Sequence, residues 1–227
     1  MTLVKICGLT TSETVDVAID AGADYLGFVL FPRSPRALTI EQARSLLERA
    51  RGRALGVVLL VDPDDERLDD VSALRPDLIQ LHGAETPERA SEIENRLGVP
   101  VIKALPVATA ADVDDAHAYA VSHVMFDASP RADADRPGGH GRPFDWSLLR
   151  QTGHGTGPTA RPKREFGTVP GGPWFLAGGL TLDNVAEAIR VTGAPAVDLS
   201  SGVESAPGVK DPALIRAFIQ AVRNAAP

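Results

Sequence analysis

The chain has 227 residues, a formal net charge of −7 at pH 7 and one cysteine. A chain of this length buries a large core without covalent staples, and a single thiol excludes an intramolecular disulfide and a multi-cysteine zinc or iron–sulfur site. There is no Lys/Arg cluster, no tripartite N-terminal signal and no apolar run near the roughly 18 residues of a membrane span, so we expect a cytoplasmic protein whose partner is a small molecule, not nucleic acid or membrane.

Short apolar runs rich in β-forming residues alternate with helical patterns along the chain, which is typical of βα units around a parallel sheet. The runs predicted as strands are residues 3–6, 25–30, 54–60, 78–81, 99–103, 123–126, 174–177 and 196–199. Eight such units in 227 residues predict an α/β fold, a single-domain (β/α)8 TIM barrel over residues 1–227. A doubly wound open sheet is disfavoured, because "CGLTTS" after the first run does not match the G-x-G-x-x-G loop of that fold.

Helical spacing is clear before the last predicted strand, where Val185, Ala188 and Ile189 repeat at helical intervals. The hydroxyl of Thr181 is predicted to cap the first turn of this helix. Gly193 is predicted to take the left-handed conformation beyond its last turn.

Two segments interrupt the alternation. Residues 151–172 contain six glycines and three prolines, which predicts a flexible insertion between the sixth helix and the seventh strand, on the face opposite the active site and without a function of its own. Residues 128–143 follow the sixth strand and therefore belong to the catalytic face, where a glycine-bearing loop can act as a lid.

Polar side chains are predicted to gather at one end of the barrel. Side chains along a strand alternate between two faces, so an inward Cys7 places Lys5 inside the barrel as well. The same alternation directs His82, Asp127 and Asp198 inward at the ends of the fourth, sixth and eighth strands. Barrel enzymes build their sites at these carboxyl ends.

Each of these side chains also has a purely structural explanation. A lone buried cysteine is more often a small hydrophobe than a nucleophile or base. Asp127 could cap the next turn, Asp198 could pair with Lys5, and His82 could be a hydrogen-bonded core histidine. Independent structural roles would not have to share one face of one barrel, so their coincidence favours an active site.

Two glycine-bearing loops predict a phosphate site. "LAGGLT" at 176–181 places Gly178 and Gly179 before a helix, whose free N–H groups and dipole attract an anion. "DLSSGVE" at 198–204 places Ser201 and Gly202 after the eighth strand. Loops after strands seven and eight form the recurrent phosphate site of this fold, so the pair indicates a phosphorylated ligand.

A set of short motifs follows one order along the chain. The motifs are "KICGLT" at 5–10, "FPRSPR" at 31–36, "QLHG" at 80–83, "FD" at 126–127, "GGHGRPFDW" at 138–146, "LAGGLT" at 176–181, and "VDLSSGVES" with "PGVKD" within 197–211. Together they resemble the phosphoribosylanthranilate isomerase family of tryptophan biosynthesis over essentially the whole chain. The departures are the Gly/Pro-rich segment 151–172 and a slightly extended loop after Asp127, which leave the catalytic residues in place.

The resemblance implies an aldose–ketose isomerase that needs neither cofactor nor metal. It implies an Amadori rearrangement of N-(5′-phosphoribosyl)anthranilate to 1-(o-carboxyphenylamino)-1-deoxyribulose 5-phosphate, with Cys7 as general base and Asp127 as general acid. Opening of the sugar ring needs a proton on the ring oxygen, which a carboxylic acid shielded from water can supply. A base on the other side then removes the C2′ proton of the Schiff base, giving an enolamine that ketonises.

The resemblance also assigns the residues that hold the substrate. Arg36 binds the anthranilate carboxylate, which the planar guanidinium can hold through two parallel hydrogen bonds. His82 and Asp198 line the sugar site. The residues expected at the phosphate are Gly178, Gly179, Ser201 and Gly202, with Gly141 as a further candidate.

Two hypotheses address how Cys7 becomes a thiolate. A thiol with an ordinary pKa of about 8.5 is mostly protonated at neutral pH, so a cation has to favour the thiolate. Lys5, two residues earlier on the same face, is one source of that field. In the competing hypothesis Asp198 takes up Lys5 and leaves the thiol unassisted.

Other functions and the oligomeric state remain open. A metal-dependent phosphosugar epimerase needs a His and carboxylate cluster, whereas His82 alone among the five histidines is expected to face the site. The related isomerase of histidine biosynthesis uses aspartates as acid and base, so Cys7 disfavours it, although one chain could serve both pathways. A non-catalytic phosphate-binding barrel would not need both Cys7 and Asp127. No periodic apolar stripe indicates an interface, and we expect a monomer rather than a dimer.

Overall fold

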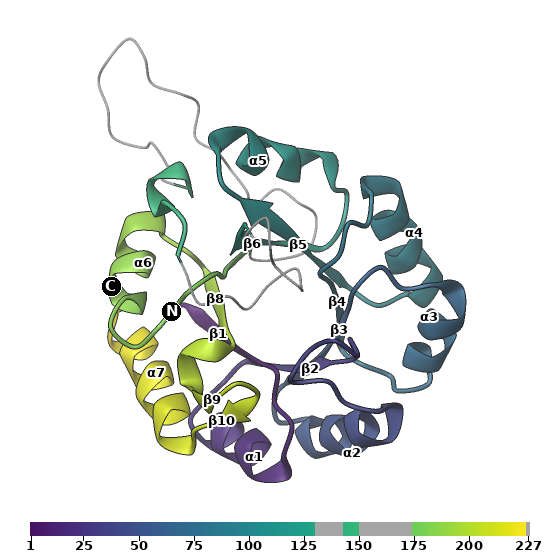
Figure 1. Cartoon of the computed structure of the whole chain (residues 1–227), viewed down its shortest axis with the longest axis horizontal. Helices are drawn as coiled ribbons and strands as arrows, with labels where there is room; N and C mark the ends of the chain where they lie inside the picture. The colour runs from purple at the N-terminus through teal and green to yellow at the C-terminus, as the bar shows by residue number, and fades with distance from the viewer. Residues whose placement is uncertain (130–142, 150–173, 226–227) are drawn as a thin grey trace.

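Eight parallel strands close into a barrel in the order β1-β2-β3-β4-β5-β6-β7-β8, and helices surround it (Figure 1). The strands are β1 (Leu3–Cys7), β2 (Tyr25–Val29), β3 (Leu55–Leu60), β4 (Leu78–Leu81), β5 (Val101–Val107), β6 (His123–Ala128), β7 (Phe175–Leu176) and β8 (Ala196–Leu199). This computed structural model describes residues 1–129, 143–149 and 174–225. The predicted (β/α)8 barrel and all eight strand positions are confirmed, with bounds that differ by a few residues.

Helices cover the outside of the barrel. They are α1 (Ser12–Asp20), α2 (Ile40–Ala50), α3 (Asp65–Ser72), α4 (Pro87–Leu97), α5 (Ala110–Asp114), α6 (Val185–Thr192) and α7 (Pro212–Ala225), with 3₁₀ turns η1 (Asp115–Ala118), η2 (Trp146–Leu149) and η4 (Ser201–Val203). Side chains of Thr11, Thr39, Asp64 and Thr86 cap four of these helices by accepting from the N–H three residues on. Within the described ranges, no helix is long and apolar enough to cross a membrane.

The helix before β8 starts later than predicted. Thr181 lies in a turn, where its N–H donates to Asn184 Oδ1 at 2.8 Å and its carbonyl accepts from Val185 N at 3.1 Å. The prediction that the Thr181 hydroxyl caps α6 is wrong, because three turn residues separate Thr181 from the first helical residue. The left-handed C-cap at Gly193 is confirmed by its φ of 66°.

A short antiparallel hairpin after β8 is an element that the sequence patterns above do not predict. β9 (Glu204–Ala206) pairs with β10 (Val209–Lys210), and Pro207 and Gly208 form the turn between them. Gly208 has a φ of +82°, and a Cβ there would overlap the carbonyl oxygen of Pro35 in the loop after β2. The hairpin therefore packs closely on that loop, and the contact requires glycine.

Side chains fill the inside of the barrel. Inward residues form one apolar layer in which the rings of Tyr25 and Phe175 pack edge to face, with centroids 5.2 Å apart. Lys5 is inside the barrel and fully buried, as the alternation predicts. Cys7 lies beyond it in a small cluster with Val29 and Leu59. Cys7 thus lies among apolar side chains at the carboxyl ends of the first three strands.

Three expectations fall outside the described residues. They are the flexible insertion at 151–172, most of the loop at 128–143, and the phosphate-site candidate Gly141.

Candidate active site

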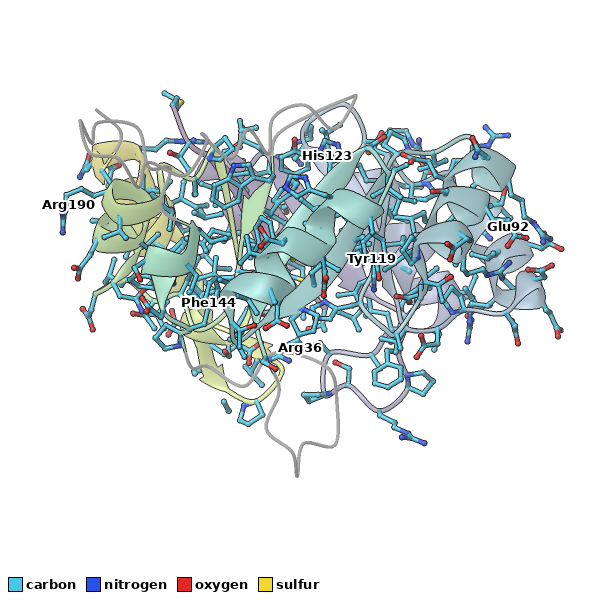
Figure 2. The ribbon with its side chains drawn as sticks, turned by 90° about the horizontal axis from the view of Figure 1, so that it is seen from above. Arg36, Glu92, Tyr119, His123, Phe144 and Arg190 are labelled. Carbon is cyan, nitrogen blue, oxygen red and sulfur yellow. The ribbon has the colours of Figure 1, made fainter. Side chains whose placement is uncertain are left out.

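Polar residues from separate strands come together at one end of the barrel. Cys7 ends β1, Asp127 lies near the end of β6, and His82 directly follows β4. In the side view of Figure 2, Arg36, which follows β2, lies toward one end and His123, the first residue of β6, toward the other. The site is therefore at the carboxyl ends of the strands, where barrel enzymes have theirs.

A histidine and a backbone amide hold Asp127. His82 Nε2 lies 3.1 Å from Asp127 Oδ2, and Ala128 N–H donates to Asp127 Oδ1 at 2.8 Å. Gln80 Nε2 is 2.9 Å from His82 Nδ1. An amide nitrogen donates and cannot accept, so Nδ1 of a neutral His82 is the acceptor and Nε2 carries the proton that faces Asp127. The Gln80–His82–Asp127 chain thereby orients the carboxylate.

The Gln80 amide has one unused group. Its Oε1 is buried and has no hydrogen-bond partner among the described residues, and its Nε2 has Met125 Sδ as a second, weak acceptor at 3.5 Å. If the amide turned by half a rotation, Oε1 would accept from the Nδ1–H of a protonated imidazole. Gln80 can therefore pair with either charge state of His82.

A cleft opens beside this chain of contacts. Its lining comes from the ends of β4, β5 and β6 and consists of His82, Gly83, Ala104, Leu105, Pro106, Asp127 and Ala128. The His82 and Asp127 side chains are 14% and 11% exposed. A ligand in the cleft can therefore reach Asp127, while the largely apolar walls shield the carboxyl group from bulk water.

Cys7 lies among charges that act on its pKa in opposite directions. Burial raises the pKa of the thiol above its ordinary value, Lys5 and Lys210 lower it, and Asp198 adds to the rise. Lys5 Nζ donates to Asp198 Oδ1 at 2.7 Å inside the barrel. Asp198 thus pairs with Lys5, but Lys5 still lowers the pKa of Cys7, so the thiol is not left unassisted as the competing hypothesis expects. The result is a thiol that stays protonated to higher pH than an ordinary cysteine.

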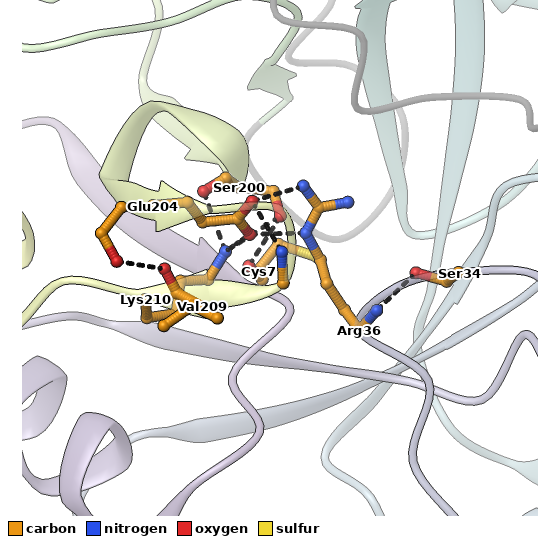
Figure 3. A network of polar contacts seen from close by, with 9 residues as sticks. Cys7, Ser34, Arg36, Ser200, Glu204, Val209 and Lys210 are labelled. Atoms are coloured by element: carbon orange, nitrogen blue, oxygen red, sulfur yellow. Dashed lines mark hydrogen bonds and ion pairs between the residues drawn. The ribbon is translucent and has the colours of Figure 1, made fainter.

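Arg36 is a buried member of a charged cluster rather than a solvent-exposed loop residue. Its Nε and Nη2 donate to Glu204 Oε1 and Oε2 at 2.6 and 2.8 Å. Lys210 Nζ donates to Glu204 Oε1 at 2.6 Å and to the Ser200 carbonyl at 2.8 Å (Figure 3). We call these three side chains the Arg36–Glu204–Lys210 cluster.

The cluster keeps Glu204 ionised. Burial by itself would raise the pKa of Glu204, but the hydrogen bonds and charges of Arg36 and Lys210 outweigh it and hold the pKa below its ordinary value. Gly208 N–H gives the carboxylate a further hydrogen bond at 3.2 Å. Burial lowers the pKa of Lys210, although Glu204 opposes this effect.

The two loops expected at the phosphate contact each other. Gly178 and Gly179 both have left-handed backbones, with φ of 84° and 63°, and their N–H groups donate to no other described residue. A Cβ on Gly202 would overlap the Leu180 carbonyl oxygen, so the loop after β8 touches the loop after β7. Ser201 begins η4 at this contact. Two N–H groups without a partner among the described residues therefore lie where an anion could bind.

Sequence reasoning missed Glu204 and Lys210 and treated Gln80 only as a strand position. The Pro207-Gly208 dipeptide is a turn signal, but a regular hairpin drawn around it would pair Lys210 with Ser205. A shift in register between Val209 and Lys210 pairs Lys210 with Glu204 instead, and no local pattern predicts that shift. The contact between Glu204 and Arg36 has no such local signal, because the two residues are 168 positions apart.

Comparison with known sequences shows one family over nearly the whole chain. Residues 4–221 match the family described as N-(5'phosphoribosyl)anthranilate (PRA) isomerase. The N-(5'-phosphoribosyl)anthranilate isomerase of Paramagnetospirillum magneticum is 52% identical over 227 residues, covering 99% of this chain and 98% of that protein. The enzyme of the same name from Bradyrhizobium diazoefficiens is 51% identical over 224 residues, covering 97% of this chain and 93% of that protein.

Solved structures of such isomerases share the fold. Phosphoribosyl anthranilate isomerase from Thermotoga maritima matches with a TM-score of 0.82 and 33% identity, covering 99% of this chain and 100% of that one. A complex of such an isomerase with reduced 1-(o-carboxyphenylamino)-1-deoxyribulose 5-phosphate matches with a TM-score of 0.78 and 31% identity, with the same coverage. A third structure, of monomers of the dimeric Thermotoga maritima enzyme, matches with a TM-score of 0.79, 32% identity and the same coverage.

Proposed function

The chain belongs to the N-(5'-phosphoribosyl)anthranilate isomerase family of tryptophan biosynthesis, and from this premise we propose that Cys7 and Asp127 carry out the two proton transfers of the reaction. One observation supports this assignment above the others. A thiol and a carboxyl group lie at the same end of the barrel, on strands separated by β7 and β8, and each is almost entirely buried beside a partner that can stabilise its charged form.

Asp127 serves as the acid that opens the sugar ring. In its protonated form it gives a proton to the ring oxygen, the C1′–O bond breaks, and the lone pair of the anthranilate nitrogen forms the Schiff base. The carboxylate left behind accepts a hydrogen bond from His82, whose Nε2 is 3.1 Å away. Gln80 holds the imidazole through Nδ1, so the ring keeps the orientation in which Nε2 faces Asp127.

Cys7 serves as the base in the next step. Its thiolate removes the C2′ proton of the Schiff base, and the electron pair of that C–H bond forms the enolamine. The C2′ hydroxyl then loses a proton while C1′ gains one, which yields the ketose. Lys5 and Lys210 are the cations that favour the thiolate against the burial of the site.

The rest of the site holds the two ends of the substrate. Arg36 binds the anthranilate carboxylate, and the loops with Gly178, Gly179, Ser201 and Gly202 bind the phosphate. Support for these assignments comes from the buried guanidinium and from the left-handed glycines, whose N–H groups have no partner in the described part of the chain. The related isomerase solved with a reduced, phosphorylated product analogue shows that this fold accepts such a molecule.

His82 and Asp198 line the sugar site in this proposal, and each also binds a neighbouring side chain there. His82 orients Asp127, and Asp198 holds Lys5 below Cys7. For the oligomeric state we propose a monomer, although the Thermotoga maritima relative is described as dimeric.

A steady-state assay with freshly prepared phosphoribosylanthranilate tests the catalytic pair. Loss of anthranilate-type fluorescence is followed for the unmodified protein, Cys7→Ser and Asp127→Asn. We expect each variant to lose about 10²- to 10⁴-fold in kcat, the usual contribution of a positioned acid or base. Both variants should still bind the reduced product analogue, which separates lost chemistry from lost folding.

His82→Asn serves as the matched variant for the acid. It removes the ring that orients Asp127 but leaves the carboxyl group itself, so its loss in kcat should be smaller than that of Asp127→Asn. If Cys7→Ser converted the substrate as fast as the unmodified protein, the thiol would only pack in the core and the proposed base would be wrong.

A further inference from the structure

Glu204 occupies one edge of the Arg36 guanidinium, and no described residue occupies the other edge. A guanidinium has two forks of N–H donors, one formed by Nε and Nη2 and the other by Nη1 and Nη2. Glu204 takes the Nε and Nη2 fork with both of its oxygens (Figure 3). Nη1 donates to no described residue, so the second fork remains available to bind a carboxylate end-on.

The charge of Glu204 would by itself cancel that of Arg36. An Arg–Glu pair is neutral, and an incoming carboxylate would meet the negative charge of Glu204 directly behind the guanidinium. Lys210 offsets the negative charge of Glu204, because its ammonium donates to Glu204 Oε1 at 2.6 Å. Two positive side chains and one negative one leave the cluster with one unit of positive charge, which matches a single carboxylate.

Because the cluster is buried, its net charge strongly affects how well it attracts an anion. The side chains of Arg36, Glu204 and Lys210 are 7%, 4% and 0% exposed. Solvent screens charges in such a place only weakly, so one uncompensated charge changes the attraction for an anion strongly.

The surrounding backbone fixes the cluster in position. Gly208 N–H donates to Glu204 Oε2, and Lys210 Nζ donates to the Ser200 carbonyl. The Arg36 stem packs on Gly8, where a Cβ would overlap it. The open fork of Arg36 is thus held in one orientation before substrate arrives, which lowers the entropic cost of binding.

We propose that Glu204 and Lys210 are positioning residues that make the enzyme selective for a substrate with a carboxylate on its arylamine. Glu204 orients the Arg36 guanidinium, and Lys210 offsets the charge of Glu204 so that Arg36 still attracts the carboxylate. This inference rests on the proposed assignment of Arg36 to the anthranilate carboxylate.

The test compares two substrates that differ only in this carboxylate. Phosphoribosylanthranilate and N-(5′-phosphoribosyl)aniline are assayed with each variant, and the selectivity is the ratio of their kcat/KM values. A general loss of folding, or a change in the pKa of Cys7, lowers both values together and leaves the ratio unchanged. Only a change in recognition of the carboxylate moves the ratio.

Lys210→Met should lower the selectivity by about tenfold, mainly through a higher KM for phosphoribosylanthranilate, because Glu204 then neutralises Arg36. The double variant E204Q/K210M should recover most of this selectivity. Its glutamine oxygen still accepts from Arg36, and the cluster again carries one unit of positive charge. Glu204→Ala should lose selectivity, because nothing then orients the guanidinium.

Arg36→Met separates a failure of this inference from a failure of the proposed function. If Arg36→Met kept the selectivity of the unmodified enzyme, the assignment of Arg36 itself would be wrong. If Arg36→Met lost it but Lys210→Met and Glu204→Ala kept it, only the positioning role would be overturned. Failure of E204Q/K210M to recover what Lys210→Met loses would overturn the charge-balance argument.

Discussion

At the scale of single residues, the thiol of Cys7 is easy to follow because it is the only one in the chain. Ultraviolet absorbance of the thiolate, or the rate of alkylation, therefore reports one group. Burial raises its pKa, so we expect the native protein to titrate at higher pH than a model thiol. On this account kcat/KM increases with pH as the thiolate forms.

Lys5→Met should shift this titration to still higher pH, because the charge of Lys5 lowers the pKa of Cys7. Asp198→Asn should shift it the other way, since the Asp198 carboxylate raises that pKa. The two substitutions alter the two members of one buried ion pair, so each is the control for the other. An unchanged titration in Lys5→Met would dismiss the electrostatic role of Lys5.

At the scale of elements, a further buried ion pair holds two loops at the carboxyl end of the barrel in place. Lys103 of β5 donates from Nζ to Glu85 Oε2 and to the Gly83 carbonyl, both at 2.7 Å. Glu85 also accepts from Asp62 N at 2.9 Å and from Gly83 N at 3.0 Å. These contacts tie the loop after β3 to the loop after β4, and the latter begins with His82.

Lys103→Met should destabilise the protein by about 3–5 kcal/mol, the usual cost of leaving one buried charge without its partner. Urea denaturation measures this as a lower midpoint with an unchanged slope. The double variant K103M/E85Q should recover part of the loss, because no unpaired charge then remains. A loss below about 1 kcal/mol in Lys103→Met would show that the pair behaves like an exposed ion pair.

At the scale of the whole molecule, the described surface gives no sign of a shared apolar face. The large exposed apolar side chains of the described residues are Met1, Leu55, Leu182 and Val209, and they belong to separate parts of the chain. Single exposed apolar residues of this kind are normal on a monomer.

Light scattering coupled to size exclusion tests the oligomeric state. We expect a mass near the 23.9 kDa of one chain at every concentration that the method reaches. A mass of twice that value would contradict the monomer and match the dimeric description of the Thermotoga maritima relative. The same column run at high salt distinguishes a weak charged contact from a stable interface.

The sequence by itself determined the barrel and the identity of its chemical groups. Strand and helix signals are local, because a strand alternates with period two and a cap acts within one turn, so eight strands and the inward positions of Cys7 and Asp127 could be predicted. The misplaced start of α6 shows the limit of that reasoning, since Thr181 has the right side chain for a cap but lies in a turn before the helix.

Only the tertiary structure decided which groups are partners. Arg36 and Glu204, Lys5 and Asp198, and His82 and Asp127 are far apart along the chain, and closure of the barrel brings each pair within hydrogen-bonding distance. The energy of such contacts depends on distance and burial, which no local pattern contains. The sequence therefore supplied the acid, the base and the guanidinium, and the fold decided which neighbours set their charge and orientation.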